Sequence, residues 1–229
     1  MAAQTHSAPA ANTPAAIRQY SQPVSERKAW YISGLLLLLG EALLLIVAIL
    51  VFWQGSVHHG APEAVFNIVG AVLAIVFFTV FSGITVVAPG RAHVVQLFGN
   101  YKGTIREPGM QWVNPFAKRI AVSTRIRNLE SAQAKVNDAD GNPIEIAAVV
   151  VWQVEDTAQA TYSVDDYVKF VAIQTETAVR HIASSYPYDS RGAEGVLSLR
   201  ENADEITQKL SGELTDRVRA AGVQVVETG

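Results

Sequence analysis

The chain of 229 residues contains no cysteine. This absence excludes disulfide bonds, thiol catalysis and metal sites built from thiolates, and it agrees with a reducing cytoplasm. Catalytic motifs are also lacking: there is no Gly-x-Ser-x-Gly elbow, no His-Glu-x-x-His pair and no glycine-rich phosphate or dinucleotide loop. We therefore expect a protein that is not an enzyme and that holds no cofactor and no metal ion.

Charged residues are almost missing from two long apolar runs, residues 30–53 and 64–88. Glu41 is the one charged residue of the first run, and the second run has none. As a helix of about 24 residues, each run would measure roughly 36 Å, more than the roughly 30 Å of a bilayer's hydrocarbon core. The sequence predicts a transmembrane hairpin over residues 30–88. The alternative is a pair of buried core helices in a soluble protein.

The connection between the two runs, residues 54–63, has no Lys or Arg. Basic residues lie instead outside the hairpin, at Arg18, Arg27, Lys28, Arg91, Lys102 and Arg106. Cytoplasmic flanks of membrane spans carry such an excess of Lys and Arg. We expect a multi-pass protein of the inner (plasma) membrane, with both termini and the following domain in the cytoplasm.

Glu41, Asn67 and Thr79 are polar side chains within the predicted spans. A charge at the bilayer centre costs several kcal/mol, so Glu41 should be protonated, face another helix or line water. One interpretation is an ion or proton pathway. The other is a protonated glutamic acid that bonds to a neighbouring helix, with Asn67 and Thr79 as possible partners. We favour the second, because the spans contain no basic partner for an ion relay.

The rest of the chain divides by composition and charge. Residues 1–29 are rich in Ala, Pro, Ser, Thr and Gln, which predicts a disordered cytoplasmic segment. Residues 89–135 have eight Lys or Arg against two Asp or Glu, whereas residues 136–229 have seven against sixteen. We expect a basic lobe beside the anionic inner leaflet and an acidic lobe further away. In residues 136–229 the Lys and Arg residues are offset by acidic residues, so we expect no nucleic acid as a partner.

Short strands separated by turns are predicted from Ile84 to Val154, and a closing strand at residues 223–227. The acidic turn at residues 138–142 resembles the start of an EF-hand loop. Pro143 stands where that loop needs glycine and Val149 where it needs glutamate, so we predict a hairpin turn instead.

Two amphipathic helices are predicted in the second lobe. Ser163 begins a capping-box pattern before apolar residues spaced by three and four up to Ile182, and Ser198 begins another that leads to Val218. Gly222 is expected to end the second helix. Strands followed by helices and a closing strand indicate an α+β fold.

Aromatic and basic side chains lie close together in the basic lobe. Trp112 and Phe116, followed by Lys118 and Arg119, are candidates for contact with lipid headgroups. Ordinary packing of the two aromatic rings in the core is the alternative.

A set of motifs from about Val87 to the end of the chain resembles one family. In order, they are Val94–Gly99, Pro108–Phe116, the turn 138–142, Val149–Asp156, Tyr162–Tyr167, Arg180, Arg200–Glu201 and Gly222–Glu227. They are similar to the SPFH (Band 7) domain of the stomatin, prohibitin, flotillin and HflK/HflC superfamily. The resemblance implies a two-lobed α+β domain of antiparallel strands packed with helices, attached to a membrane at its N-terminal end and without enzymatic activity.

The resemblance also implies a function. Relatives assemble into large rings or cages over a patch of membrane, organise its lipids and regulate membrane proteins, in some branches an AAA+ membrane protease. Many relatives have a single anchor, so two spans are a departure, and the orientation here depends on the charge rule. We expect a homo-oligomeric scaffold of a membrane microdomain, with lipids and, as in those branches, such a protease as partners. The alternatives are a channel or transporter subunit that uses the Glu41 helix and, with least support, a membrane-tethered hydrolase.

Overall fold

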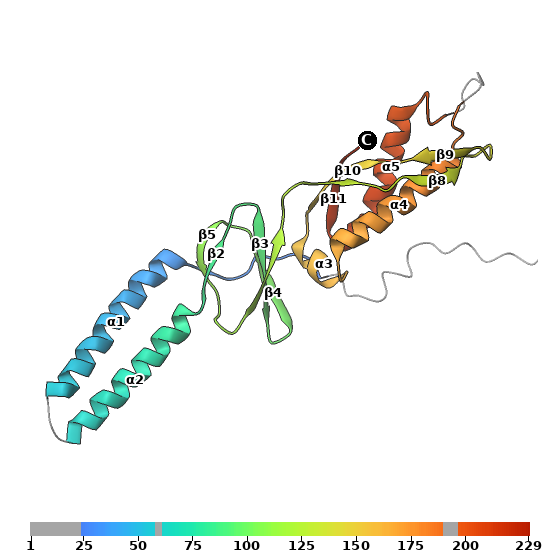
Figure 1. Cartoon of the computed structure of the whole chain (residues 1–229). Coiled ribbons are helices and arrows are strands. Elements are labelled where there is room, and N and C mark those ends of the chain that lie inside the picture. Colours follow the sequence, from blue (N-terminus) through green and yellow to red (C-terminus); the bar gives the residue numbers. More distant parts are fainter. Residues whose placement is uncertain (1–23, 58–60, 190–196) are drawn as a thin grey trace, which may run out of the picture.

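The computed structural model describes residues 24–57, 61–189 and 197–229. Two long apolar helices, α1 (Gly34–Val57) and α2 (Ala61–Phe81), lie antiparallel and side by side at one end of an elongated molecule (Figure 1). The remaining elements form a head at the other end. Within the head, strand-rich and helix-rich lobes follow one another away from α1 and α2.

The helices do not follow the predicted runs 30–53 and 64–88. Residues 30–33 are not helical, and Ile32–Ser33 form strand β1. At the other end, α2 stops at Phe81 and Ile84–Val87 form strand β2. Three of these four residues of β2 are β-branched aliphatic, and such residues suit a strand as well as a membrane span. Hydropathy alone could therefore not locate the end of the helix.

The lobe next to α1 and α2, called the proximal lobe below, contains two three-stranded antiparallel sheets, β1-β5-β2 and β4-β3-β6. Its small core includes Val87, Val95, Ile105 and Val113. The further strands are β3 (Arg91–Leu97), β4 (Asn100–Ile105), β5 (Gly109–Trp112) and β6 (Lys118–Ser123).

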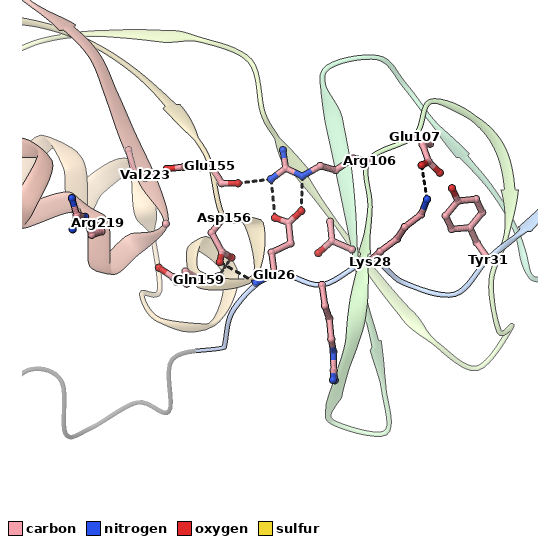
Figure 2. A pocket seen from close by; sticks show the side chains of 13 residues that line it. Glu26, Lys28, Tyr31, Arg106, Glu107, Glu155, Asp156, Gln159, Arg219 and Val223 are labelled. Carbon is pink, nitrogen blue, oxygen red and sulfur yellow. Dashed lines mark hydrogen bonds and ion pairs between the residues drawn. The ribbon is translucent and has the colours of Figure 1, made fainter.

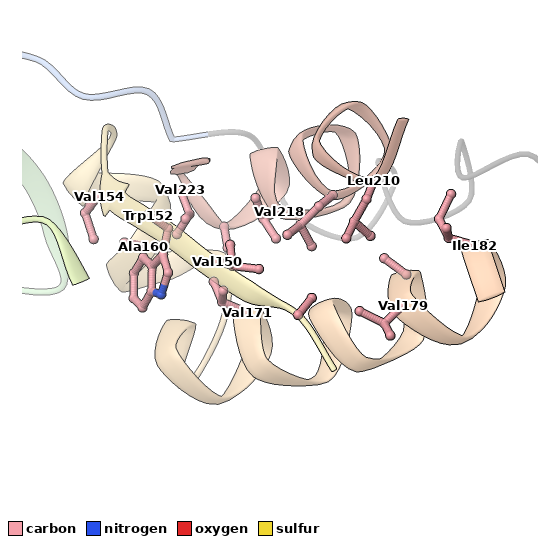
Figure 3. Packing of buried hydrophobic residues seen from close by; sticks show 14 of the residues in the cluster. Val150, Trp152, Val154, Ala160, Val171, Val179, Ile182, Leu210, Val218 and Val223 are labelled. Carbon is pink, nitrogen blue, oxygen red and sulfur yellow. The ribbon is translucent and has the colours of Figure 1, made fainter. Parts of the chain in front are cut away.

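The second lobe, called the distal lobe, packs α4 and α5 with the antiparallel sheet β11-β10-β7 and the hairpin β8-β9. Figure 3 shows Val150 and Trp152 of β10 among apolar side chains of the helices. The bounds are β7 (Arg127–Glu130), β8 (Ala134–Asn137), β9 (Pro143–Ile146), β10 (Val149–Val154), α3 (Thr157–Tyr162), α4 (Tyr167–Ser185), α5 (Ala203–Val218), the 3-10 helix η2 (Arg219–Ala221) and β11 (Val223–Thr228).

The mixed α+β fold with antiparallel sheets confirms the fold class that was predicted for the head. The boundary between the lobes differs from the prediction at residue 135. Strand β7 pairs with β10 of the distal lobe, so the distal lobe begins between Ser123, the end of β6, and Arg127, the start of β7. A short strand carries no sequence sign of which partner it will choose.

The two predicted helix starts were wrong, whereas the predicted buried faces are largely confirmed. Asp166, not Ser163, caps α4, because Ser163 ends the preceding helix α3. Ser198 accepts a hydrogen bond from the Glu201 N–H at 3.2 Å, but α5 begins five residues after it, at Ala203. Buried positions agree with the predicted faces at Val171, Ala178, Val179, Ile182, Ile206, Leu210, Leu214 and Val218, whereas Val168 and Ala203, which were predicted on the same faces, are exposed.

The predicted hairpin turn at residues 138–142 is confirmed between β8 and β9. The Asp138 carboxylate accepts hydrogen bonds from the backbone N–H groups of Asp140 and Asn142, at 3.0 and 2.7 Å. The Tyr188 N–H donates to the same carboxylate at 3.0 Å. Asp138 therefore joins the hairpin to the end of α4.

Candidate functional site

Residues 24–31, called the strap below, precede α1 and lie against the head (Figure 1). The Ala29 N–H donates to the Thr104 carbonyl at 3.0 Å, and the Thr104 N–H donates to the Arg27 carbonyl at 2.8 Å. Ala29 is 4% exposed and belongs to the core of the proximal lobe. The prediction of disorder for residues 1–29 was thus wrong for residues 24–29, and residues 1–23 lie outside the described residues.

Glu26 fastens the far end of the strap. Its carboxylate accepts hydrogen bonds from Arg106 Nε and Nη2, at 2.5 and 2.8 Å, and from the N–H and hydroxyl of Thr157, both at 2.8 Å. The Glu26 N–H donates to the Asp156 carboxylate at 3.0 Å. Figure 2 shows Arg106 reaching across to Glu26 and to the Glu155 carbonyl. The strap therefore connects the proximal lobe, through Arg106, with the distal lobe, through α3.

The charges at this site support each other. Burial disfavours the ionised form of Glu26, but the hydrogen bonds from Arg106 and Thr157 outweigh burial and lower the pKa of Glu26 below its ordinary value. The same hydrogen bond raises the pKa of Arg106, against the effect of burial. Both groups are ionised at neutral pH, and a charge-assisted bidentate pair holds the strap in place.

Close approach of the strap to β4 depends on a glycine. Gly103 has a φ of 142°, and a Cβ atom built on it would lie 2.5 Å from the Cα and N atoms of Ala29. Any side chain at position 103 would push the strap away. Docking of the strap therefore requires glycine at position 103 as well as the ion pair of Glu26 with Arg106.

A groove of about 620 Å³ runs beside the strap, between it and α3. Its charges are mixed, and Glu26, Arg106 and Lys28 are already engaged in ion pairs. Across residues 24–57, 61–189 and 197–229 no three His, Asp or Glu side chains gather in a way that could hold a metal ion. The groove shows structural pairing of charges and not an arrangement of nucleophile and base.

The four predicted headgroup contacts have different roles. Trp112 Nε1 donates to the Val80 carbonyl at 2.7 Å, and Arg119 Nη2 donates to the Ser82 carbonyl at 3.2 Å. These bonds satisfy carbonyls at the end of α2 that have no partner inside the helix. Burial lowers the pKa of Arg119. Phe116 and Lys118 are exposed and remain available for a membrane surface.

The structure does not bring the three predicted intramembrane polar residues together. Glu41 is 5% exposed where α1 packs beside α2, and its Oε2 atom has no hydrogen-bond partner. The Thr79 hydroxyl donates to the Ile75 carbonyl of its own helix at 2.8 Å. Asn67 lies on the exposed side of α2. Of the three residues, Glu41 alone is buried.

Sequence reasoning missed the strap because its contacts join residues 74 to 131 positions apart. A weak signal was present. Three consecutive charged residues, Glu26 to Lys28, stand in a segment whose one other Lys, Arg, Asp or Glu is Arg18, and the basic residues alone were used, as a sign of orientation. The family motifs begin after α2, so they gave no information about the residues before α1.

Comparison with known proteins agrees with this architecture. The model of the SPFH domain / Band 7 family matches residues 85–229, the part of the chain that begins within β2. This chain belongs to that family. A stomatin homologue of Pyrococcus horikoshii is 25% identical over 167 residues. That alignment covers 71% of this chain and 60% of the relative's length.

The helix α1 has the length and composition of a membrane span. Its segment Gly34–Gln54 has 21 residues and a mean hydropathy of 3.0, and it is near the N-terminus. In α2 the apolar part, Val65–Phe81, is shorter. With the stomatin relative, α1 indicates that this SPFH protein is associated with a membrane.

Proposed function

We propose that this SPFH protein is a non-enzymatic membrane scaffold, anchored by α1 and α2 and assembled from many copies into a ring or cage. The observation that carries the proposal is the strap, which joins the residues before α1 to the head that follows α2. The family supports a scaffold associated with a membrane. The steps below concern the anchor, the orientation and the assembly.

The anchor crosses the bilayer twice. If α1 alone crossed, the strap and the head would lie on opposite faces and Glu26 could not reach Thr157 at 2.8 Å. Strap docking therefore supports an even number of crossings. The apolar part of α2, Val65–Phe81, is at the short end of the roughly 17–25 residues with which a helix spans the hydrocarbon core.

The surface of the helix pair supports the same anchor. Large apolar side chains are more than half exposed along both helices, among them Leu43, Phe52, Ile68 and Phe78. A soluble monomer rarely exposes an apolar surface of this extent. Acyl chains are the partner that such a surface needs.

Charge supports the orientation. Basic residues lie at the strap and in the proximal lobe, and cytoplasmic flanks are enriched in such residues. The scaffold is then a multi-pass protein of the inner (plasma) membrane, with both termini and the head in the cytoplasm. Its partners are membrane lipids, further copies of itself and membrane proteins within the enclosed patch, including an AAA+ membrane protease.

Assembly follows from the shape and attachment of the head. An elongated head fixed to an anchor presents different sides to its two neighbours, and repeated contacts between unlike surfaces close into a ring. Native mass measurement and negative-stain imaging of protein extracted in mild detergent test this step. We expect closed particles of many copies. Monomers or small dimers at every concentration would contradict the assembly.

A channel or transporter subunit is the second candidate function. The observation that favours it is the buried Glu41 carboxyl, whose Oε2 atom has no partner. Flux of protons or cations into liposomes that contain the protein tests it, with Glu41→Gln as the matched variant. Flux that disappears in the variant supports a pathway, and silence in both proteins excludes it.

A further inference from the structure

Two phenylalanines project from turns of the proximal lobe. Phe98, in the turn between β3 and β4, is 84% exposed, and Phe116, in the loop between β5 and β6, is 70% exposed. Neither ring contributes to a core cluster. Phe98 was not singled out from the sequence, where it ends an apolar strand and looks like part of the core.

The backbone at Phe98 is unusual for so large a residue. Its φ of 48° is in the left-handed region, and no other non-glycine residue of the described segments has a positive φ. Leu97 pairs with Asn100, so Phe98 and Gly99 form a two-residue hairpin loop in which both have positive φ. Such loops favour Asn before Gly, and a bulky residue there is strained. Folding alone therefore does not account for phenylalanine at this position.

The two rings lie at the same end of one sheet. Strands β3 and β6 are antiparallel, and Gln96 pairs with Lys118. Continuing this register by two residues sets Phe98 opposite Phe116. In Figure 1 the β3–β4 turn and the β5–β6 loop are both at the lower edge of the proximal lobe.

This end of the sheet is the one beside the membrane anchor. The Val113 N–H, just before the β5–β6 loop, donates to the Gly83 carbonyl at 3.0 Å. Just after the loop, Arg119 donates to the Ser82 carbonyl. The loop that carries Phe116 is thus held on both sides against the end of α2. Lys102 and Lys118 are exposed close to the two turns in sequence.

We propose that Phe98 and Phe116 insert into the lipid interface beside the anchor, with Lys102 and Lys118 at the level of the headgroup phosphates. Exposed aromatic rings flanked by lysines suit an anionic leaflet, and the site continues the surface of α2. This inference rests on the proposed anchor. It adds a second attachment, which fixes the inclination of the head relative to the bilayer.

The test uses the full chain in vesicles of phosphatidylcholine with phosphatidylglycerol. Since the protein has no cysteine, Phe98→Cys and Phe116→Cys each give a single site for a nitroxide label. Asp140→Cys, in the exposed β8–β9 turn, is the aqueous control, and Leu43→Cys, exposed on α1, is the lipid reference. Relaxation by oxygen and by a water-soluble nickel chelate reports the depth of each label.

We expect the labels at positions 98 and 116 to respond to oxygen more than to the chelate, with a depth between those at 43 and 140. Labels at 98 and 116 that behave like the label at 140, while position 43 remains in lipid, would overturn this inference and leave the anchor intact. A label at position 43 that is in water would overturn the anchor as well.

A second variant separates insertion from folding. Because Asn suits the turn, Phe98→Asn should keep or raise the thermal unfolding midpoint, yet move the label at position 116 towards water. The matched control is Ile173→Asn, which removes a half-exposed apolar side chain from α4 in the distal lobe and should leave that depth unchanged. A lower midpoint for Phe98→Asn, or an unchanged depth at position 116, would contradict the proposal.

Discussion

The two lobes of the head are held together in different ways. The larger core cluster of the head has 17 buried apolar residues, including Trp152 and Leu214, and all but two of them, Val94 of β3 and Val122 of β6, come from the distal lobe. The core of the proximal lobe has six, and one of them, Ala29, comes from the strap. The distal lobe is therefore stabilised mainly by its own apolar core, whereas the proximal lobe packs β3 and β6 against that core and also depends on a segment that precedes α1 and on its polar contacts.

This difference shows how an anchor can be coupled to a head. The covalent chain connects α2 with β2 through a short turn, and α1 is joined to the head by the docked strap and by β1, which pairs with β5. Four variants or titrations test the comparison of the two lobes.

The largest effect is expected for Leu214→Ala in the distal core. Leu214 is fully buried, so the lost burial and the cavity should lower the free energy of unfolding by about 3–5 kcal/mol. Hydrogen exchange in detergent should show faster exchange of α4 and α5 while β3 and β4 keep their protection. Equal loss of protection in both lobes would mean that Val94 and Val122, which belong to the same cluster as Leu214, make the proximal lobe depend fully on this core.

The next effect is expected for Gly103→Ala, which attacks the strap. The new Cβ would meet the backbone of Ala29, and the positive φ adds strain, so the cost should be at least about 1–3 kcal/mol. Amides of residues 24–31 should exchange faster, while the distal core is unaffected. Gly141→Ala is the matched control: its φ is 85° but no atom is within 4 Å of the new Cβ. The same loss of strap protection in both variants would argue against the contact.

Glu26→Gln removes the charge of the ion pair with Arg106 and should lower the stability of strap docking by about 1.5–3 kcal/mol. The exposed pair of Glu107 with Lys28 is the control, and Glu107→Gln should cost about 0–1 kcal/mol.

The pKa of Glu26 is lowered in the folded protein, so its contribution to stability is complete at neutral pH and is lost as the pH falls below 4.5. Exchange of the strap amides against pH, in the wild type and both variants, measures this. A strap that stays docked at acidic pH would contradict it.

The smallest effect is expected for Asp138 in the distal lobe, because its carboxylate titrates far below neutral pH. Hydrogen bonds from Asn142, Tyr188 and Asp140 outweigh burial and lower the pKa of Asp138 from 3.8 to about 2. Its contribution to stability is therefore present above about 3.8 and is lost as the pH falls towards 2. Carboxyl chemical shifts against pH would measure the midpoint. A midpoint at the ordinary value would mean that the turn does not hold the carboxylate.

Much of the head could be predicted because its signals are local. The spacing of Val171, Ala178 and Ile182 gave the buried face of α4, and Asp138 to Asn142 gave a turn. The start of α4 was misplaced, because Ser163 and Asp166 both have the side chain of a cap and only the end of α3 decides between them.

The candidate site could not be predicted to the same extent. Glu26 and Thr157 meet only because the strap crosses β4, and no pattern within either segment indicates the other. Trp112 and Arg119 were predicted as candidates for contact with lipid headgroups, but their bonds to the carbonyls of Val80 and Ser82 depend on where α2 ends. That end was the least certain boundary, because β-branched residues suit both a span and a strand.

Site-directed labelling in sealed, oriented membrane vesicles tests the double crossing of α1 and α2 most directly. Ser25→Cys on the strap, Asp140→Cys on the head and Gln54→Cys near the far end of α1 would each be exposed to a membrane-impermeant maleimide on one side. The double crossing predicts that positions 25 and 140 react from the cytoplasmic side and position 54 from the opposite side. Reaction of positions 25 and 140 from opposite sides would contradict it.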